Sequence, residues 1–441
     1  MQQFLFAVIR GARSFRLLAL LALAASTAAA ATPPERSLLL SADAMVDVTS
    51  GELVQDAAVL IVDGKIVASG PRASITAPED SETLHLAGHT LLPGLIDMHV
   101  HLTSRADQHG YRQLALSDER KTINGVVNAR RTLLAGFTSV RNLGADAYAD
   151  VALRDAIADG DIPGPRLFVS GPPIGITGGH CSDENLLPAQ FQHTGEGVAD
   201  GPWAARAKVR QNIKYGADLI KTCSTGGVLS RGTKVGAPQY TLEELQALVE
   251  EAHSHGLRVA SHAHGAEGIN NALRAGVDTI EHASFIDEEG IRLARKQGAA
   301  LAMDIYVTEY ILGEGEAAGI LPESLDKERA TGTVQRENFR NAHRAGVTMI
   351  YGTDAGVYPH GENARQLSRM TQFGMSPAEA LRSATVNAAR ALGREEQLGQ
   401  LAPGFLADII AVAGNPLEDI ATLENVRFVM QGGVIHKEPQ A

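Results

Sequence analysis

The sequence is poor in cysteine and aromatic residues, with two cysteines and one tryptophan among 441 residues. Two cysteines cannot build a disulfide framework, and both Cys181 and Cys223 lie beside segments that carry candidate site residues. Each is therefore expected to be a free, buried thiol. Beyond the N-terminal region, no apolar stretch approaches the roughly 20 residues that span a bilayer, so we expect no stable membrane span.

Positive charge is also scarce. The chain has 39 lysines and arginines against 51 aspartates and glutamates, which gives a formal net charge of −12 at pH 7. Because such a composition offers no basic patch to a polyanion, it argues against nucleic acid as a partner.

Residues 1–31 have the pattern of a secretory signal peptide. Arg10, Arg13 and Arg16 precede a short apolar stretch, and small residues follow it up to Ala31. Cleavage near the end of this segment would export the protein to the periplasm or out of the cell, and the loss of three arginines would lower the net charge to −15. The alternative is an uncleaved anchor, but the apolar stretch is well short of a bilayer span.

The two ends of the chain share one pattern, and the middle has another. Residues 36–92 and 391–441 consist of short apolar runs separated by turns, and Asp63-Gly64 between two such runs is a strong hairpin signal. We expect both ends to pair in one small β-sandwich domain. Residues 93–390 alternate strands with helices, which predicts an α/β fold, a (β/α)8 TIM barrel.

The middle region contains eight expected strands and two well-marked helix starts. Thr241 and Ser376 are each followed three residues later by a glutamate, which is the capping box of a helix N-terminus. Two connections, 172–203 and 308–344, are long enough to form a lid, a pocket wall or a subunit contact. The expected strands are 94–102, 137–143, 166–171, 217–223, 258–265, 279–284, 300–307 and 349–355.

His99 and His101 end the first of these strands two positions apart, so alternation along the strand sends both imidazoles to the same side. Converging imidazoles suit zinc and its transition-metal neighbours. Ligand-type residues also end four later strands: Lys221, His262, His282 and Asp354. Because the carboxyl ends of the strands meet at one face of a parallel barrel, these residues predict a single metal site there.

Four segments resemble the metal-dependent amidohydrolase superfamily, and the resemblance extends over nearly the whole chain after residue 31. The segments are 92–101, 220–227, 352–356 and 401–410. The likeness is greatest to the group of Xaa-Pro and Xaa-Arg dipeptidases, which is related to imidazolonepropionase and includes ochratoxin-cleaving amidohydrolases. The resemblance implies two divalent metal ions, with zinc the default, a carbamate on Lys221 that bridges them, and a homo-oligomer, commonly an octamer.

The resemblance implies that His99, His101 and Asp354 hold one metal and that His262 and His282 hold the other. Two such metals can share a hydroxide that is nucleophilic at neutral pH, and one of them can polarise the scissile carbonyl. Asp354 would take the proton from that hydroxide and pass it to the departing amine. We therefore expect cleavage of the amide bond to a C-terminal amino acid. The substrate would be a dipeptide or an N-acyl amino acid, such as an ochratoxin-type acyl-phenylalanine.

A lysine can join such a site only if its amine is neutral, and burial near cations favours that form of Lys221. Mononuclear deaminases of the superfamily resemble one another in carrying a glutamate three residues after the histidine of strand five, where this chain has Gly265. Both features argue against deamination and against imidazolonepropionase activity. The alternatives are a lactonase or cyclic-amide hydrolase with the same metals, and a non-catalytic scaffold, which the complete ligand set opposes.

Further residues are candidates for contact with the substrate. His264, two residues beyond a predicted ligand, is expected either to hydrogen-bond the substrate carbonyl or to orient its neighbour. His180 and His360 lie on loops after strands three and eight and are expected to point into the pocket. Gly226 and Gly227 allow close backbone approach, which could expose their amides to a substrate carboxylate.

Overall fold

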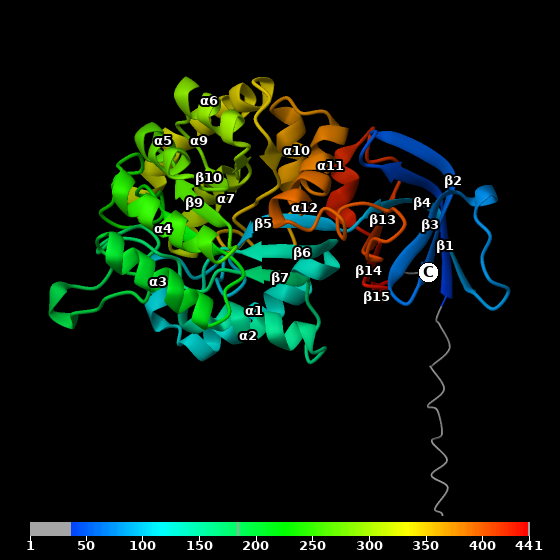
Figure 1. Cartoon of the computed structure of the whole chain (residues 1–441), viewed down its shortest axis with the longest axis horizontal. Helices are drawn as coiled ribbons and strands as arrows, with labels where there is room; N and C mark the ends of the chain where they lie inside the picture. Colours follow the sequence, from blue (N-terminus) through cyan, green and yellow to red (C-terminus); the bar gives the residue numbers. More distant parts are fainter. Residues whose placement is uncertain (1–36, 183–184, 440–441) are drawn as a thin grey trace, which may run out of the picture. The chain divides into compact units, whose positions relative to one another are not determined.

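Residues 37–182 and 185–439 are described by the structure, a computed structural model, and they belong to one compact unit. The expected signal peptide, residues 1–31, lies outside this part of the chain. None of the helices in the described residues is both long and apolar enough to cross a membrane. Two kinds of sheet organise the unit: one large, mostly antiparallel sheet, and two parallel sheets flanked by helices (Figure 1).

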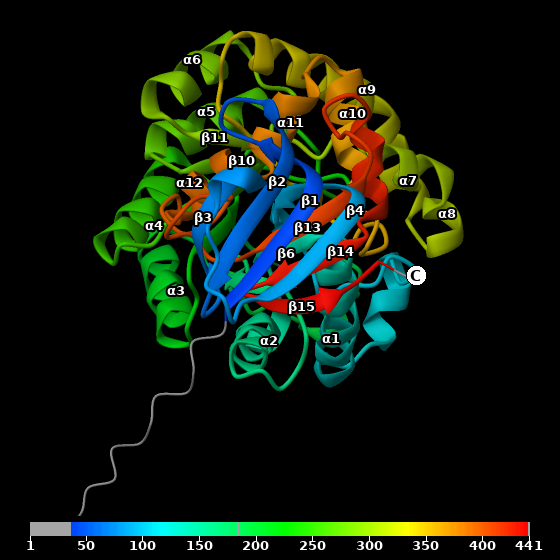
Figure 2. The ribbon, with the colours of Figure 1, turned by 90° about the vertical axis from the view of Figure 1, so that its right-hand side faces the viewer.

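The large sheet contains strands from both ends of the chain (Figure 2). From edge to edge it consists of β15 (Val434–Lys437), β14 (Phe428–Gln431), β13 (Ile409–Ala413), β4 (Glu82–Pro93), β1 (Ser37–Asp47), β2 (Glu52–Val62) and β3 (Lys65–Pro71). Neighbouring strands are antiparallel except β1 and β4, which are parallel. The two chain ends therefore pair in one sheet, as predicted.

The hairpin between β2 and β3 turns at Asp63 and Gly64, as the sequence predicts. Both residues have positive φ angles, 47° and 76°, as a type I′ turn requires. A Cβ atom on Gly64 would lie 2.5 Å from the carbonyl oxygen of Gly432. Only glycine fits at this point, where the turn meets the C-terminal strands.

The sandwich arrangement stays a prediction, and the described strands of this region form a single continuous sheet. Lys65 on the edge strand β3 forms a bridge to Leu406, just before β13, so the sheet bends back towards its own middle. Its apolar core includes Leu40, Val59 and Phe428, all fully buried. Strands of 11 and 12 residues are long enough to twist through this bend without separating into two sheets.

The middle of the chain forms parallel strands in two sheets. One sheet consists of β5 (Leu95–Val100), β6 (Phe137–Asn142) and β7 (Arg166–Val169), and the other of β8 (Ile220–Cys223), β9 (Val259–Ala263), β10 (Thr279–His282), β11 (Ala300–Ala302) and β12 (Met349–Ile350). All the predicted strands of this region are confirmed, each shorter than expected. Isolated parallel bridges join Val100 to Ala355 and Ile174 to Thr222, and each links a strand of one sheet to the residues that follow a strand of the other.

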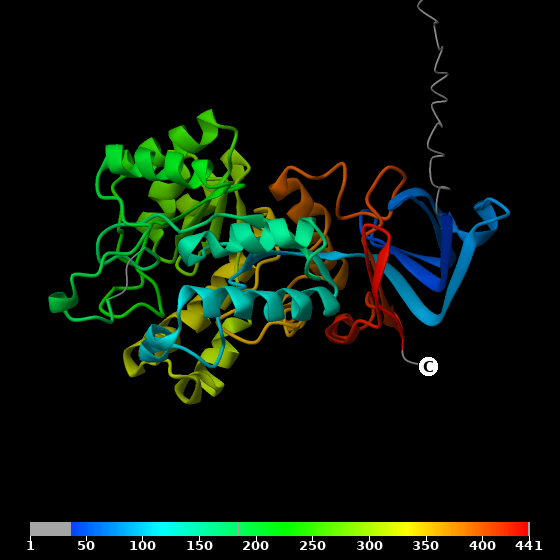
Figure 3. The ribbon, with the colours of Figure 1, turned by 90° about the horizontal axis from the view of Figure 1, so that it is seen from below.

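Helices follow most of the parallel strands and lie along them (Figures 1 and 3). Both predicted capping boxes are present, at the starts of α4 and α11. The helices are α1 (Asp118–Leu134), α2 (Ala149–Ala158), α3 (Pro202–Lys214), α4 (Leu242–Ser254), α5 (Ala266–Ala275), α6 (Glu288–Gln297), α7 (Val307–Gly313), α8 (Gly315–Ala318), α9 (Pro322–Arg344), α10 (Arg365–Gln372), α11 (Pro377–Ser383) and α12 (Val386–Leu392).

The largest apolar core lies between the parallel strands and their helices. Leu245 and Leu248 of α4 are fully buried in the same cluster as Val259 of β9 and Ile280 of β10. Close packing of this kind leaves the strands little freedom to shift. It therefore fixes the strand ends, where the polar side chains of the site begin.

Candidate metal centre

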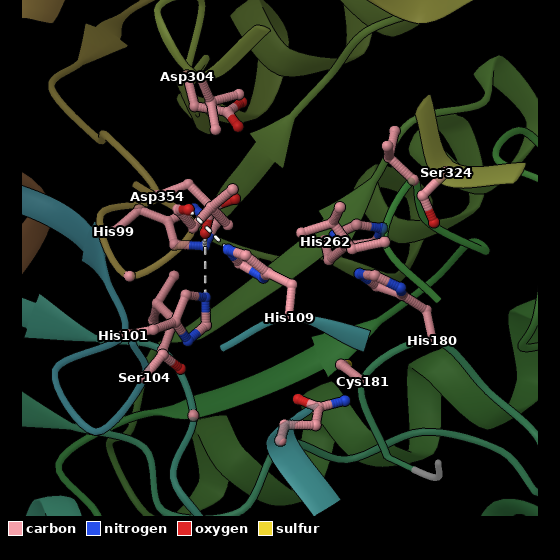
Figure 4. Close-up of a pocket in the computed structure, with 18 of the residues that line it drawn as sticks. His99, His101, Ser104, His109, His180, Cys181, His262, Asp304, Ser324 and Asp354 are labelled. Atoms are coloured by element: carbon pink, nitrogen blue, oxygen red, sulfur yellow. Dashed lines mark hydrogen bonds and ion pairs between the residues drawn. The ribbon is translucent and has the colours of Figure 1, made fainter. Parts of the chain in front are cut away.

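The structure brings the six predicted ligands together around one cavity of about 330 Å³. Each comes from a parallel strand or from the residues after it: His99 from β5 and His101 just after it, Lys221 from β8, His262 from β9, His282 from β10 and Asp354 after β12. Figure 4 shows the His99 and His101 side of the cavity opposite the His262 side. The shared direction of the parallel strands explains why residues so distant in sequence meet here.

Asp354 faces the two histidines of β5. Its Oδ1 lies 3.4 Å from Nε2 of His99 and 3.2 Å from Nε2 of His101. Its amide donates to the carbonyl oxygen of His99 over 2.8 Å, and its φ of 59° is unusual for a residue with a side chain. Burial opposes ionisation of Asp354, but His99 and His101 outweigh burial and hold the pKa of Asp354 below its ordinary value. An ionised carboxylate therefore points at two imidazoles.

His262, His264 and His282 form a second group, in which one ring nitrogen of each lies within 4.8 Å of the others. His180, from the loop after β7, packs on His262 with 4.1 Å between ring centroids. Burial lowers the pKa of His262 and His264 well below the ordinary value and that of His180 to about 3, and neighbouring imidazoles add to the shift. Neutral imidazole is the form of histidine that coordinates metals.

His282 and Lys221 lie where the two groups meet. The ring of His282 belongs to both, because one of its nitrogens is also within 4.8 Å of ligand atoms of His99 and Asp354. Burial lowers the pKa of Lys221 to about 8, although nearby carboxylates including Asp354 oppose the shift. Crowded imidazoles beside an ionised carboxylate are the donor set that zinc and neighbouring transition metals prefer, so these residues fit a metal site.

Sequence reasoning missed Glu281 and Arg141, which support the site from inside the parallel sheets. Oε1 of Glu281 accepts a hydrogen bond of 2.7 Å from Arg141, and Oε2 lies 3.2 Å from Nδ1 of His99. Arg141 also donates to the carbonyl oxygen of Met98 over 2.6 Å. Both charged side chains are at most 3% exposed. Each stands one residue before the end of its strand, as His99 does, so position along the strand alone does not distinguish this pair from the ligands.

Asp304, also missed, lies two residues after the end of β11 and orients His282. Its Oδ1 lies 2.9 Å from Nδ1 of His282 and accepts a hydrogen bond of 2.8 Å from Gln335. Burial lowers the pKa of His282, but Asp304 outweighs burial and raises it overall. A carboxylate in this position fixes the tautomer and the orientation of a metal-binding histidine. The strand-end rule did not select Asp304, because the seventh strand was predicted to run to residue 307, whereas β11 ends at Ala302.

Three more histidines line the cavity: His180, His264 and His109. Nδ1 of His264 lies 2.7 Å from Oγ of Ser284, which sets the orientation of the ring. His109 was missed by the sequence reasoning, and its Nε2 lies 2.9 Å from the carbonyl oxygen of Val357. Nothing but its place on the loop after the first parallel strand could have indicated His109.

The expectation of two free thiols is wrong, because Cys181 and Cys223 form a disulfide. Their Cα atoms are 6.2 Å apart, and 42 positions separate them in the sequence. The long connection after β7 crosses the end of β8, where Ile174 forms a bridge to Thr222. This crossing brings Cys181, next to His180, against the last residue of β8.

The prediction that His360 points into the pocket does not fit the structure. Its Nε2 lies 3.1 Å from the carbonyl oxygen of His101, and its Nδ1 lies 3.1 Å from Oγ1 of Thr132. Both ring nitrogens are thus used within the protein. His360 instead supports the backbone of His101 through this contact with its carbonyl oxygen.

The prediction that Gly226 and Gly227 offer open amides does not fit either. The amide of Gly226 donates to the carbonyl oxygen of Ala237 over 3.0 Å, and that of Gly227 donates to Oγ1 of Thr233 over 3.3 Å. A Cβ atom on Gly227 would lie 2.2 Å from the ring of His180. Glycine is required there to admit His180, not to expose a carboxylate site.

Comparisons with known proteins agree with this geometry. A model of the amidohydrolase family matches residues 90–436. The ochratoxinase of Aspergillus niger is 34% identical over 415 residues, which cover 88% of this chain and 84% of that protein. The crystal structure of a Xaa-Pro dipeptidase with bound methionine aligns with a TM-score of 0.86 at 36% identity, covering 91% of this chain and 100% of the other. That of a prolidase complexed with N-methylphosphonate-L-proline aligns with a TM-score of 0.83 at 31% identity, covering 91% and 100%.

Proposed function

The chain belongs to the amidohydrolase family and is an enzyme that hydrolyses amide bonds, and we propose that it does so with two metal ions. Its substrate would be a dipeptide or an N-acyl amino acid, from which it releases the C-terminal amino acid. The observation that carries the proposal is the gathering of six ligand-type side chains around one cavity. The names of similar proteins support the substrate class, since they include an ochratoxinase, a Xaa-Pro dipeptidase and a prolidase.

His99, His101 and Asp354 would hold one divalent ion, and His262 and His282 would hold the other. Lys221 would lie between them as a carbamate. Burial lowers the pKa of Lys221 to about 8, which supports this, because carbon dioxide reacts with the neutral form of the amine. When bound, the ions supply Lewis-acid polarisation of a carbonyl and a water of lowered pKa. The histidine-rich donor set favours zinc.

Asp354 is placed to hold and move a proton during the reaction. Its ionised carboxylate can take a proton from the attacking water and return it to the departing amine nitrogen. His264 is placed to donate a hydrogen bond to the substrate carbonyl, because Ser284 holds its Nδ1 and leaves Nε2 available. Apolar side chains of the cavity wall, such as Val307 and Ile311, exclude competing water from the bound substrate.

A finer architecture and a location belong to the same proposal. Residues 93–390 would close into a (β/α)8 barrel, and the bridges between the two parallel sheets support such closure. Residues 36–92 and 391–441 would form the second domain. Export after cleavage of residues 1–31, and assembly into a homo-oligomer, stay predictions from the sequence.

The test is release of free amino acid by the mature enzyme loaded with Zn²⁺. Dipeptides and N-acyl amino acids ending in proline, phenylalanine or arginine are the probes, and lactones test the alternative. We expect release from at least one amide, loss of activity on chelation, and recovery when Zn²⁺ returns. Asp354→Asn is expected to lower kcat by about 10²–10⁴-fold, the usual contribution of proton transfer.

The matched control is Asp326→Asn, which removes a carboxylate that is 76% exposed on α9. This variant is expected to keep the activity of the wild type. Turnover of lactones alone would contradict the proposal, and so would the absence of any turnover by enzyme with a full metal content. Activity that survives in Asp354→Asn would contradict the role of Asp354.

A further inference from the structure

α9 turns a polar face towards the cavity, where a buried helix face is normally apolar. Along the first half of this face, at helical spacing, stand Ser324, Glu328, Thr331 and Gln335, each at most 3% exposed. In the second half the same face carries Phe339 and Ala342, both fully buried. The four polar residues line the cavity of the candidate metal centre. The helix face is therefore polar where it borders the cavity and apolar where it packs against the core.

Two of these side chains have partners within the protein, and two have polar atoms without one. Gln335 donates to Asp304, and the hydroxyl of Thr331 donates to the carbonyl oxygen of Lys327. Oγ of Ser324 and Oε1 of Glu328 are buried and have no hydrogen bond of good geometry among the described residues. The hydroxyl of Thr308 lies near Glu328 and favours its ionised form, but Oγ1 of Thr308 lacks such a bond as well. Buried polar atoms are nearly always hydrogen-bonded, so we expect the Ser324 and Glu328 atoms to bond to a ligand that enters the cavity. Figure 4 shows Ser324 on the His262 side of the cavity.

The basic side chains near Glu328 on α9 are used elsewhere. Lys327 donates to the carbonyl oxygen of Ser230 over 2.6 Å, and Arg329 pairs with Asp326. Arg336 donates to a carboxylate oxygen of another residue, Glu309, over 2.9 Å. None of these side chains forms an ion pair with Glu328. Arg336 and His282 favour its ionised form, but burial outweighs both and raises its pKa.

Gly332 reserves space for the carboxylate of Glu328. A Cβ atom on Gly332 would lie 2.8 Å from Oε1 of Glu328 and 2.6 Å from Cγ2 of Thr308. Glycine in the interior of a helix is unfavourable relative to alanine, so its presence here fits a need for that space. Glu328 also lies two turns from Gln335, about 10 Å along the helix axis, and Gln335 contacts Asp304 beside the predicted metal ligands.

We propose that Glu328, together with Ser324, forms a subsite for a cationic group of the substrate, either an ammonium or a guanidinium group. The inference rests on the proposed amide hydrolysis and narrows it to substrates with a positive charge near the scissile bond. A hydrogen bond between two charged groups is about twice as strong as a neutral one, and a water-poor cavity strengthens it further. Burial raises the pKa of Glu328, and a bound cation would keep the carboxylate ionised.

The experiment compares Glu328→Gln with the wild type on four matched probes that share the preferred C-terminal residue. Two probes begin with lysine and two with norleucine, and one of each pair is N-acetylated. We expect Glu328→Gln to lower kcat/KM by about 10–100-fold for at least one cationic probe, as expected for loss of a hydrogen bond to a charged group. For N-acetyl-norleucine, which has no cation, we expect less than about a threefold change. The norleucine probe with a free N-terminus carries only the amine cation, and the N-acetyl-lysine probe carries only the side-chain cation. These two probes therefore show which of the two cations binds.

Two controls separate the subsite from a structural role. Glu337→Gln makes the same change at an exposed position of α9 and is expected to have no effect, and Glu328→Asp keeps the charge and is expected to retain part of the preference. An equal loss on all four probes, or no loss on any, would overturn the subsite. If the wild type hydrolyses none of them, the proposed function fails. In that case calorimetry with L-lysine and L-norleucine tests the subsite. The subsite requires that the wild type binds L-lysine more tightly than L-norleucine and that Glu328→Gln abolishes this difference.

Discussion

Glu281 uses its two carboxylate oxygens for different purposes, one bonded to Arg141 and the other facing His99. Because its partner charge is equally buried, Glu281→Gln would leave the Arg141 guanidinium in the protein interior without a carboxylate. We expect this variant to lower the free energy of unfolding by about 3 kcal/mol. Urea unfolding of the metal-free protein measures the effect without a contribution from metal binding.

The double variant Arg141→Met with Glu281→Gln tests the cause of that loss. It removes both charges, so it is expected to be less destabilised than Glu281→Gln alone. If the double variant loses as much free energy of unfolding as the single variants Glu281→Gln and Arg141→Met lose together, the unpaired charge is not the cause of the destabilisation.

The same residues show what the sequence can predict about the site. His99 and Asp354 were found because strand ends meet at one face, a rule that needs no knowledge of the partners. Glu281 acts inside the sheets, and its importance depends on Arg141, which is 140 positions away. Such a pair is visible only after the strands are placed side by side. Gly227 was misread, because a glycine that makes room for a ring looks the same in sequence as one that exposes an amide.

The contact between α3 and α4 is held by Glu251, which predicts a pH dependence of stability. Hydrogen bonds from Arg210, at 2.6 and 3.0 Å, hold the pKa of Glu251 at about 2 against burial, and Arg206 adds to the effect. The ordinary value is 4.5, so the ionised form stabilises the fold above that pH. This contribution is lost progressively as the pH falls from 4.5 to about 2.

We therefore expect Glu251→Gln to lower the free energy of unfolding by about 1 kcal/mol at pH 7, a modest value because Arg210 is largely exposed to screening water. Urea titrations at pH 7, 5 and 3.5 should show the difference from wild type shrinking below pH 4.5. Glu250→Gln, at the neighbouring exposed position, is the control and should change little. A difference that is constant at every pH would contradict the argument.

Element types were easier to predict than element ends. The capping boxes at Thr241 and Ser376 marked two helix starts correctly, since the cap is a local interaction between residues three positions apart. The strand ends could not be located, because apolar residues continue after pairing stops. β11 ends at Ala302, for example, but Met303, Ile305 and Val307 follow it. The single bent sheet was also beyond prediction, because it depends on the bridge from Lys65 to Leu406.

At the scale of the whole molecule, the pairing of the two chain ends was predictable and the disulfide was not. The ends share a strand-and-turn pattern that the middle lacks, and this pattern favours one common sheet. Cys181 and Cys223 meet only because the connection after β7 crosses β8, which no local pattern indicates. A disulfide is consistent with the predicted export, since disulfides persist in oxidising compartments.

The disulfide closes a loop of 42 positions and anchors Cys181, the residue next to His180, so its loss should affect both stability and the site. Loop closure of this length contributes about 4 kcal/mol in the chain-entropy model, and we expect reduction to lower the free energy of unfolding by about 2–4 kcal/mol. The packing of His180 on His262 should loosen as well, which predicts weaker metal retention during dialysis with reductant. The control is the double variant Cys181→Ser with Cys223→Ser. Its stability and metal retention should match those of the reduced protein and should not change when reductant is added. Equal stability of the oxidised and reduced wild type would show that packing alone holds this loop.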